Sequence, residues 1–284
     1  MSETVFLDSE LTDAERGPHA RFRVIPVPLE RTVSYGSGTA RGPAAILMAS
    51  DELEREVLGT TPCEKGIFTE SALECDGPLP AVMDRLAART EAAVRGGAVP
   101  VVLGGEHSLS YGAVTGVARA HDAAVGILQI DAHADLRVAY QGDPHSHASV
   151  MNLLTDAGFR LAQFGVRALS AEETEQRAAR NVFYRDAEDL VVHGTHNADL
   201  PDDFPELVYV SFDVDGLDPA IMPATGTPVP GGLGYYQALH LVENALKGRR
   251  CVGFDVVELA PNGQTAWDFT AASIVYRLMA ACLR

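Results

Sequence analysis

The chain has 284 residues, 46% of them hydrophobic, and a formal net charge of −17 at pH 7. This length suits one large α/β domain, and no Pro/Ser-rich linker or repeat divides the sequence, so we predict a single domain over residues 1–284. The lack of Lys/Arg clusters argues against a nucleic-acid partner, and the lack of a long apolar stretch or leader-like N-terminus argues against a membrane, which leaves a cytoplasmic protein as the expectation.

The four cysteines show no paired metal-ligand spacing. They lie far apart, at Cys63, Cys75, Cys251 and Cys282. We therefore expect reduced structural thiols and no cysteine chemistry.

Apolar, β-branched runs alternate with segments of helical periodicity along the chain, which is typical of a mainly parallel sheet. In chain order, the predicted strands are 22–27, 99–103, 125–130, 207–212 and 250–257. The predicted helices are Pro43–Ser50, Pro80–Arg95, Ser108–Ala120, His147–Asp156, Ala171–Ala179, Tyr235–Leu246 and Asp268–Leu283. We expect a doubly wound sheet with helices on both faces.

Acidic and imidazole groups follow four of these strands. Gly-Gly-Glu-His occupies 104–107, Asp-Ala-His-Ala-Asp 131–135 and Asp-Val-Asp 213–215, and Glu258 closes the run 250–257. Alternate residues of an extended chain share a face, so the acids within each string can point together. Doubly wound sheets bind ligands beyond the carboxyl ends of their strands, and we infer that these four ends meet at one rim.

Crowded carboxylates repel one another unless cations neutralise them. Carboxylate oxygens with some imidazole nitrogens suit hard or borderline divalent ions, manganese foremost, and the absence of cysteine argues against a thiolate zinc site. The predicted ligands are His107, Asp131, His133, Asp135, Asp213 and Asp215. Two ions bridged by Asp131 and Asp213, with a hydroxide between them, would catalyse a hydrolysis. Asp218 precedes Pro219 and is expected to cap a turn instead.

These strings together resemble the ureohydrolase family, which includes arginase, agmatinase and formimidoylglutamase. The resemblance extends over nearly the whole chain, through Gly38–Ile46, Gly104–Ser108, Asp131–Asp135, Ser146–Ala148, Phe164–Arg167, Ser211–Pro219, Gly226–Gly232 and Asp255–Pro261. It departs from the family at Glu106, where many relatives have Asp.

The resemblance implies a three-layer α/β/α fold, two Mn²⁺ ions and assembly as a homotrimer or homohexamer. One ion would be held by His107, Asp131, Asp135 and Asp213, and the other by His133, Asp131, Asp213 and Asp215.

The substrate would be a small cationic guanidino compound. Its hydrolysis requires a hydroxide, a carboxylate that orients the cation and a group that protonates the departing amine. We assign orientation to Glu258 and proton handling to Asp135 and His147, with His145 as the competing proton donor. Alternation along the strand is expected to put Glu258 on the face opposite Asp255, a structural group.

The segment between Leu136 and Ser146 lacks the Thr/Ser/Asn-rich string with which arginases hold arginine, and looks like an agmatinase loop. We therefore predict cleavage of agmatine, or an aminopropylated agmatine, to urea and a polyamine such as putrescine. Asp143 or Tyr140 could accept a cationic tail, whereas Arg137 could bind a carboxylate.

Three alternatives stay open. The chain could act on arginine, guanidinobutyrate or formimidoylglutamate, or it could be a metal-binding relative without turnover. The glycine- and proline-containing loop 226–232 could be a pocket wall or an ordinary turn.

Overall fold

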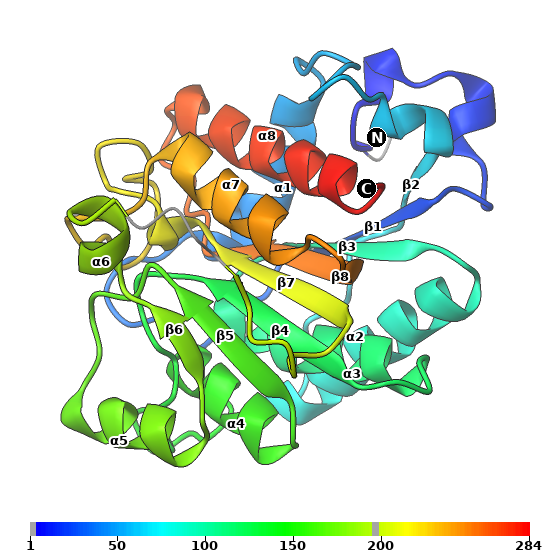
Figure 1. The fold of residues 1–284 in the computed structure, drawn as a ribbon. Coiled ribbons are helices and arrows are strands. Elements are labelled where there is room, and N and C mark those ends of the chain that lie inside the picture. Colours follow the sequence, from blue (N-terminus) through cyan, green and yellow to red (C-terminus); the bar gives the residue numbers. More distant parts are fainter. Residues whose placement is uncertain (1–3, 195–198) are drawn as a thin grey trace.

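The computed structural model describes residues 4–194 and 199–284, and its eight strands form one sheet. The strands are β1 (Phe22–Val27), β2 (Ile67–Thr69), β3 (Val99–Gly104), β4 (Val125–Ile130), β5 (Arg160–Phe164), β6 (Phe183–Arg185), β7 (Leu207–Asp213) and β8 (Arg250–Val257). Every neighbouring pair is parallel, and the order across the sheet is β2-β1-β3-β8-β7-β4-β5-β6 (Figure 1). The strands that carry the four charged clusters, β3, β8, β7 and β4, are therefore consecutive, as the sequence predicted.

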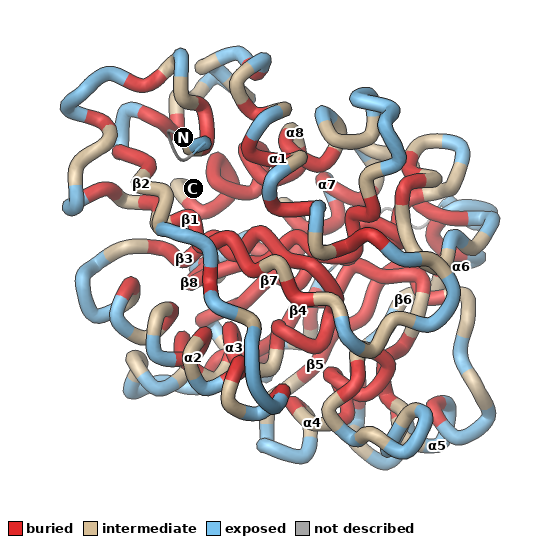
Figure 2. Tube along the Cα trace, turned by 180° about the vertical axis from the view of Figure 1, so that it is seen from behind, coloured by how far each residue is buried: buried red, intermediate tan, exposed pale blue. Residues whose placement is uncertain are grey.

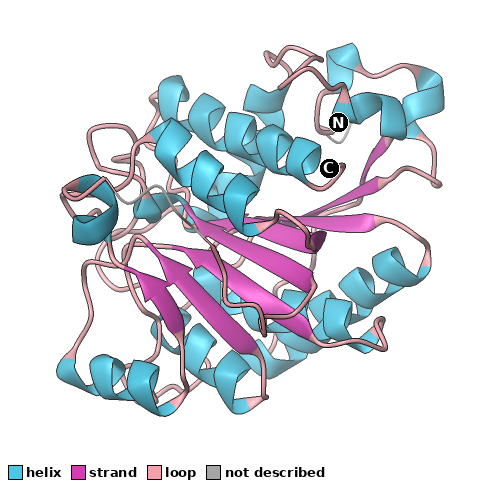
Figure 3. Cartoon of the chain, in the orientation of Figure 1, coloured by secondary structure: helices cyan, strands magenta, loops and turns pink. Residues whose placement is uncertain are grey.

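Helices cover both faces of this sheet. They are α1 (Gly42–Ser50), α2 (Leu79–Arg95), α3 (Ser110–Arg119), α4 (Val150–Asp156), α5 (Ala171–Ala179), α6 (Ala187–Val191), α7 (Tyr235–Ala245) and α8 (Thr265–Ala281). One layer contains α1, α7 and α8, and the other contains α2 to α5 (Figures 1 and 3). Short 3-10 helices are η1 (Asp8–Glu10), η2 (Asp13–Arg16), η3 (Thr39–Arg41), η4 (Pro62–Lys65), η5 (His107–Leu109), η6 (His147–Ser149) and η7 (Val214–Gly216). The three-layer α/β/α architecture is confirmed.

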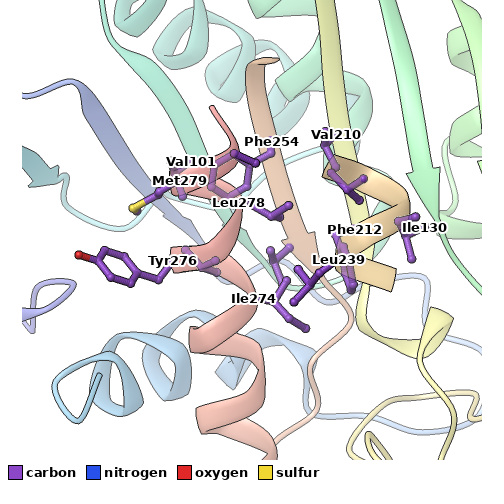
Figure 4. Close-up of a cluster of buried hydrophobic side chains, with 14 of the residues drawn as sticks. Val101, Ile130, Val210, Phe212, Leu239, Phe254, Ile274, Tyr276, Leu278 and Met279 are labelled. Atoms are coloured by element: carbon purple, nitrogen blue, oxygen red, sulfur yellow. The ribbon is translucent and has the colours of Figure 1, made fainter. Parts of the chain in front are cut away.

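Two hydrophobic cores lie on opposite faces of the sheet because alternate strand residues point in opposite directions. In β7, Val210 and Phe212 belong to the core that includes Leu239 of α7 and Ile274 of α8 (Figure 4), whereas Tyr209 belongs to the core beneath α2 and α3. The central strands are buried along almost their whole length (Figure 2). No helix among the described residues combines the length and apolar character needed to cross a bilayer.

All five predicted strands and all seven predicted helices are present. The bounds of β1, β4, β8 and α5 are as predicted, and the others differ at one or both ends. Two predicted helices begin as 3-10 turns, η5 and η6, before α3 and α4. The sequence pattern does not predict β2, β5, β6 and α6. β2 and β6 have only three residues each, and β5 contains Arg160 and Gln163, which interrupt its apolar pattern. The described cysteines are free thiols, as expected.

Gly105 brings the turn after β3 against the ends of two other strands. Its N–H donates to Val27 O at 2.9 Å, and its carbonyl accepts from Glu258 N at 2.9 Å. A Cβ atom at Gly105 would lie 1.9 Å from Leu29 O, so any side chain would displace the backbone.

Gly105→Ala is therefore expected to destabilise the fold by about 3 kcal/mol, because the contact is with backbone and cannot be relieved by a rotamer change. Urea denaturation measures this loss. Gly17→Ala is the matched control, since its Cβ would meet only Ala14 O at 3.9 Å and should change stability by less than about 0.5 kcal/mol. Equal midpoints for the two variants would refute the steric argument.

Candidate metal centre

The ends of β8, β7 and β4 are in register at the carboxyl edge of the sheet. Ile130 pairs with Phe212, so Asp131 and Asp213 follow matching strand positions, and Asp213 itself pairs with Val257. The strand pairing thus brings together groups that lie far apart in the sequence.

Three carboxylates converge on one nitrogen of His107, which is fully buried. His107 Nδ1 lies 3.2 Å from Asp131 Oδ2, 3.1 Å from Asp135 Oδ2 and 3.3 Å from Asp213 Oδ2. Nδ1 has no hydrogen-bond partner of suitable geometry among the described residues. A buried nitrogen without a hydrogen bond, faced by carboxylate oxygens, fits a site for a divalent cation.

The other nitrogen of His107 is held by a hydrogen-bond chain that the sequence analysis missed. Ser211 Oγ lies 2.8 Å from His107 Nε2 and donates to Asp255 Oδ1 at 2.8 Å. Because the serine proton points to Asp255, Ser211 Oγ accepts a hydrogen bond from the Nε2–H group, and Nδ1 is left unprotonated and free to bind a metal. Asp255 also accepts from Tyr209 Oη at 3.0 Å, so it is structural, as expected, but acts on the site through Ser211.

A second group shares Asp131 with the first. His133 Nδ1 lies 3.0 Å from Asp215 Oδ2 and 3.6 Å from Asp131 Oδ1. Asp131, His133 and Asp215 could hold one ion, and His107, Asp131 and Asp135 another. All six predicted ligands thus lie together; the bridging role of Asp213 stays a prediction.

Raised pKa values in this cluster indicate that it favours bound positive charge. Burial and the charge of Asp131 raise the pKa of Asp135 to about 7. Burial would lower the pKa of His133, but Asp131 and Asp215 raise it to about 12. Burial and repulsion from Asp215 and Asp131 raise the pKa of Asp213 well above its ordinary value. Divalent cations would replace these protons.

Glu258 lies directly after β8 and beside the first group. Its Oε1 accepts from His107 N at 2.7 Å, and burial raises its pKa to about 8. Its φ angle is 65°, and Asp135 has a φ of 50°, both in the left-handed region that non-glycine residues rarely adopt. The strand β8 ends at Val257, so the alternation of side chains between the two sheet faces does not extend to Glu258. The prediction that Glu258 lies on the face opposite Asp255 therefore does not determine where its side chain points.

His147 begins η6 and lies against the loop after β1. Its Nδ1 is 3.1 Å from Thr32 Oγ1 and its Nε2 is 2.8 Å from Ser34 Oγ. Burial lowers its pKa, which favours the neutral imidazole. The competing His145 instead donates its backbone N–H to Asp143 Oδ1 at 2.8 Å.

A cavity of about 390 Å³ opens over both metal groups. Its walls include Glu258, His147 and the tail candidates Arg137 and Tyr140, as well as Gly226 and Thr227 of the loop whose role the sequence left open. Asp143 is not among the described residues that line it.

Glu173, which the sequence analysis missed, lines the same cavity and is buried. It forms a capping box with Ser170 at the start of α5, a Ser-x-x-Glu signal that the sequence contains. Its Oε2 lies 3.9 Å from Arg137 Nη2.

Two residues support the turn that carries Asp215. Asp218 accepts from the backbone N–H groups of Ala220, Gly231 and Gly232, which confirms its predicted capping role. Arg167, which the sequence analysis did not single out, donates to Asp215 O at 2.7 Å and to Val229 O at 2.8 Å. It thereby ties the turn to the loop 226–232.

The chain is similar to known proteins over nearly its full length. A family model described as the arginase family matches residues 20–281. N(1)-aminopropylagmatine ureohydrolase of Thermus thermophilus is 40% identical over 90% of this chain and 88% of that protein. The protein of the same name from Synechocystis is 34% identical over 96% of this chain and 92% of its own length. The crystal structure of agmatine ureohydrolase of Thermoplasma volcanium has a TM-score of 0.84 and 29% identity, covering 100% of this chain and 95% of that one.

Proposed function

The chain belongs to the arginase family and is a ureohydrolase, and we propose that it uses two Mn²⁺ ions to release urea from N1-aminopropylagmatine and from agmatine. The observation that carries this proposal is the pair of His–carboxylate groups sharing Asp131, with the carboxylate of Glu258 in the same cavity. The names of the similar proteins from Thermus thermophilus and Synechocystis favour the aminopropylated substrate.

The donor set supports manganese. It combines carboxylate oxygens with two imidazole nitrogens and contains no thiolate. We propose His107, Asp131, Asp135 and Asp213 for one ion and His133, Asp131, Asp213 and Asp215 for the other. When bound, the two ions supply hydroxide as a nucleophile at neutral pH.

Glu258 is proposed to orient the guanidinium group. A carboxylate pairs with the fork of guanidinium N–H donors, and its burial strengthens that pairing. Glu258 Oε1 already accepts from His107 N at 2.7 Å, so its position is coupled to the metal group. The substrate would therefore be held beside the ions.

Asp135 and His147 are proposed to handle protons. Asp135 belongs to the first metal group, whereas His147 lies in the cavity wall beside Ser34, an exposed hydroxyl. Asp135 could take up the proton that the attacking hydroxide gives up and pass it to the departing amine, and His147 could exchange protons with solvent.

The cavity wall favours an amine tail over a carboxylate tail. Arg137 is the cation that a carboxylate substrate would need, but Glu173 lies 3.9 Å from it and offsets its charge. Glu173 and the phenol of Tyr140 are therefore the proposed acceptors for the amine end of the substrate.

We further propose that the protein forms a homotrimer or homohexamer and that it is located in the cytoplasm. Light scattering of the purified protein tests the oligomeric state, and fractionation of the cells tests the location.

A substrate panel tests the proposed activity. Manganese-loaded protein is expected to release urea from N1-aminopropylagmatine and agmatine with kcat/KM at least about tenfold above the values for arginine and guanidinobutyrate, equivalent to about 1.4 kcal/mol in tail recognition. Release of formamide from formimidoylglutamate is measured in parallel. A preference for a carboxylate substrate would reverse the assignment of the tail site, and no product from any compound would favour a noncatalytic protein.

His147→Asn is expected to lower kcat by about 10²-fold, because a positioned proton-transfer group contributes on that scale. Burial lowers the pKa of His147, and the imidazole is neutral above that pKa. Protonation of His147 should therefore contribute to the fall in rate at low pH in the wild type, and this contribution should be absent in the variant. His145→Asn is the control and should keep the wild-type profile. Identical pH–rate profiles for wild type and His147→Asn would contradict the assignment.

A further inference from the structure

Glu106, the residue before His107, is fully buried and surrounded by hydrogen-bond donors. The backbone N–H groups of Arg31 and Thr32 donate to its Oε2, that of Thr32 at 2.7 Å. The hydroxyls of Thr32 and Ser108 donate to its Oε1 at 2.8 and 2.6 Å. Because a carboxylate only accepts hydrogen bonds, the Thr32 hydroxyl proton points to Glu106.

The same Thr32 oxygen faces His147. It accepts from His147 N at 3.0 Å and lies 3.1 Å from His147 Nδ1. A hydroxyl has one proton, and the Thr32 hydroxyl already uses it in the hydrogen bond to Glu106. Its oxygen can therefore only accept a hydrogen bond from the ring. His147 Nδ1 must therefore carry the ring proton, which leaves Nε2 unprotonated in the neutral imidazole.

The partner of Nε2 is Ser34 Oγ, at 2.8 Å. Ser34 lines the substrate cavity together with His147. The nitrogen able to take up a proton is thus the one whose partner belongs to the cavity wall.

We propose that Glu106 is a positioning residue that selects the tautomer of His147 through Thr32. This inference rests on the proposed function, in which His147 handles protons, and it adds Glu106 and Thr32 to the residues that prepare His147 for that step. The arrangement repeats the chain Asp255–Ser211–His107, in which a carboxylate accepts a hydrogen bond from a hydroxyl and thereby decides which imidazole nitrogen is protonated.

Substitution of Glu106 by Gln separates this role from a general structural one. The backbone N–H groups of Arg31 and Thr32 cannot reverse, so the amide oxygen should face them and the NH₂ group should face the two hydroxyls. Thr32 would then accept from Gln and donate its proton to His147 Nδ1. The expected result is a switch of the ring proton to Nε2.

The test is ¹⁵N NMR of metal-free protein labelled at histidine, at a pH where His147 is neutral, with its signals identified by their absence in His147→Asn. The wild type should show the proton on Nδ1, and Glu106→Gln should show it on Nε2. Thr32→Val removes the hydroxyl and should lose the strict preference of the ring proton for Nδ1. Thr32→Ser keeps the hydroxyl and should keep that preference. Ser108→Ala is the control. It removes a hydrogen-bond donor to Glu106 that is not bonded to His147, so this variant should keep the wild-type tautomer.

Kinetics of the manganese-loaded variants supply the second readout. Glu106→Gln and Thr32→Val should lower kcat at least about tenfold with KM and metal content unchanged, since the affected step is proton transfer. A wild-type proton on Nε2, or an unchanged tautomer in both variants, would overturn the proposal even if urea is produced. The NMR experiment does not depend on turnover. Failure of the proposed activity would be seen in the urea assay, and failure of the tautomer proposal would be seen in the NMR spectra.

Discussion

Asp131→Asn is expected to abolish urea production, lowering kcat/KM by at least about 10³-fold, and to leave the purified protein without its full complement of manganese. Asp131 is the carboxylate that both candidate metal groups share. Its Oδ2 faces His107 Nδ1 and its Oδ1 faces His133 Nδ1, so one substitution removes an anionic donor from both ions. Asn keeps the size of the side chain, which separates the loss of charge from a loss of packing.

Metal analysis and urea assays on the same preparation measure both effects. Asp202→Asn is the matched control, because Asp202 is an exposed carboxylate away from the cavity. The control should keep wild-type metal content and activity. Two ions per subunit and normal turnover in Asp131→Asn would contradict the shared role.

Glu258→Gln is expected to lower kcat/KM by about 10²- to 10³-fold while metal content persists. This corresponds to roughly 3–4 kcal/mol, the scale of the loss when one partner of a buried ion pair is removed. The amide oxygen of Gln can still accept the His107 N–H, now 2.7 Å from Glu258 Oε1. The metal groups should therefore stay intact, and the change should affect only pairing with the guanidinium.

Steady-state kinetics with agmatine and metal analysis test this prediction. Glu172→Gln on the exposed side of α5 serves as a charge-matched control. Unchanged kinetics in Glu258→Gln would remove Glu258 from the proposed substrate site. Loss of metal together with activity would instead make it part of the metal centre.

Much of the site could be predicted because its chemistry lies at the ends of strongly apolar strands. The runs ending at Leu103, Ile130 and Phe212 are recognisable as buried strands, and each is followed by clustered acids or imidazoles. The carboxyl ends of parallel strands share one edge, so the meeting of these clusters follows from the fold class. The family resemblance then implied the roles that are proposed for individual residues.

The parts that could not be predicted depend on contacts between distant segments. Thr32 precedes its partner His147 by 115 residues, and nothing in the pattern around Thr32 indicates that contact. Glu106 lay in a recognised motif, but its four donors come from a loop and turn whose geometry the sequence does not reveal. The edge strands β2 and β6 are too short for periodicity to detect.

Glu173 was missed for a different reason. The Ser170–Glu173 pair is a capping-box pattern, which signals the start of a helix and not a ligand pocket. Its contribution to the cavity follows only from the way α5 packs beside Arg137.

Anomalous diffraction at the manganese edge from crystals of the reconstituted protein tests the central claim most directly. We expect two peaks per subunit, one among His107, Asp131, Asp135 and Asp213 and one among His133, Asp131, Asp213 and Asp215. A map with no peak at this rim, or with manganese bound elsewhere, would contradict a two-metal centre at the ends of β3, β4 and β7.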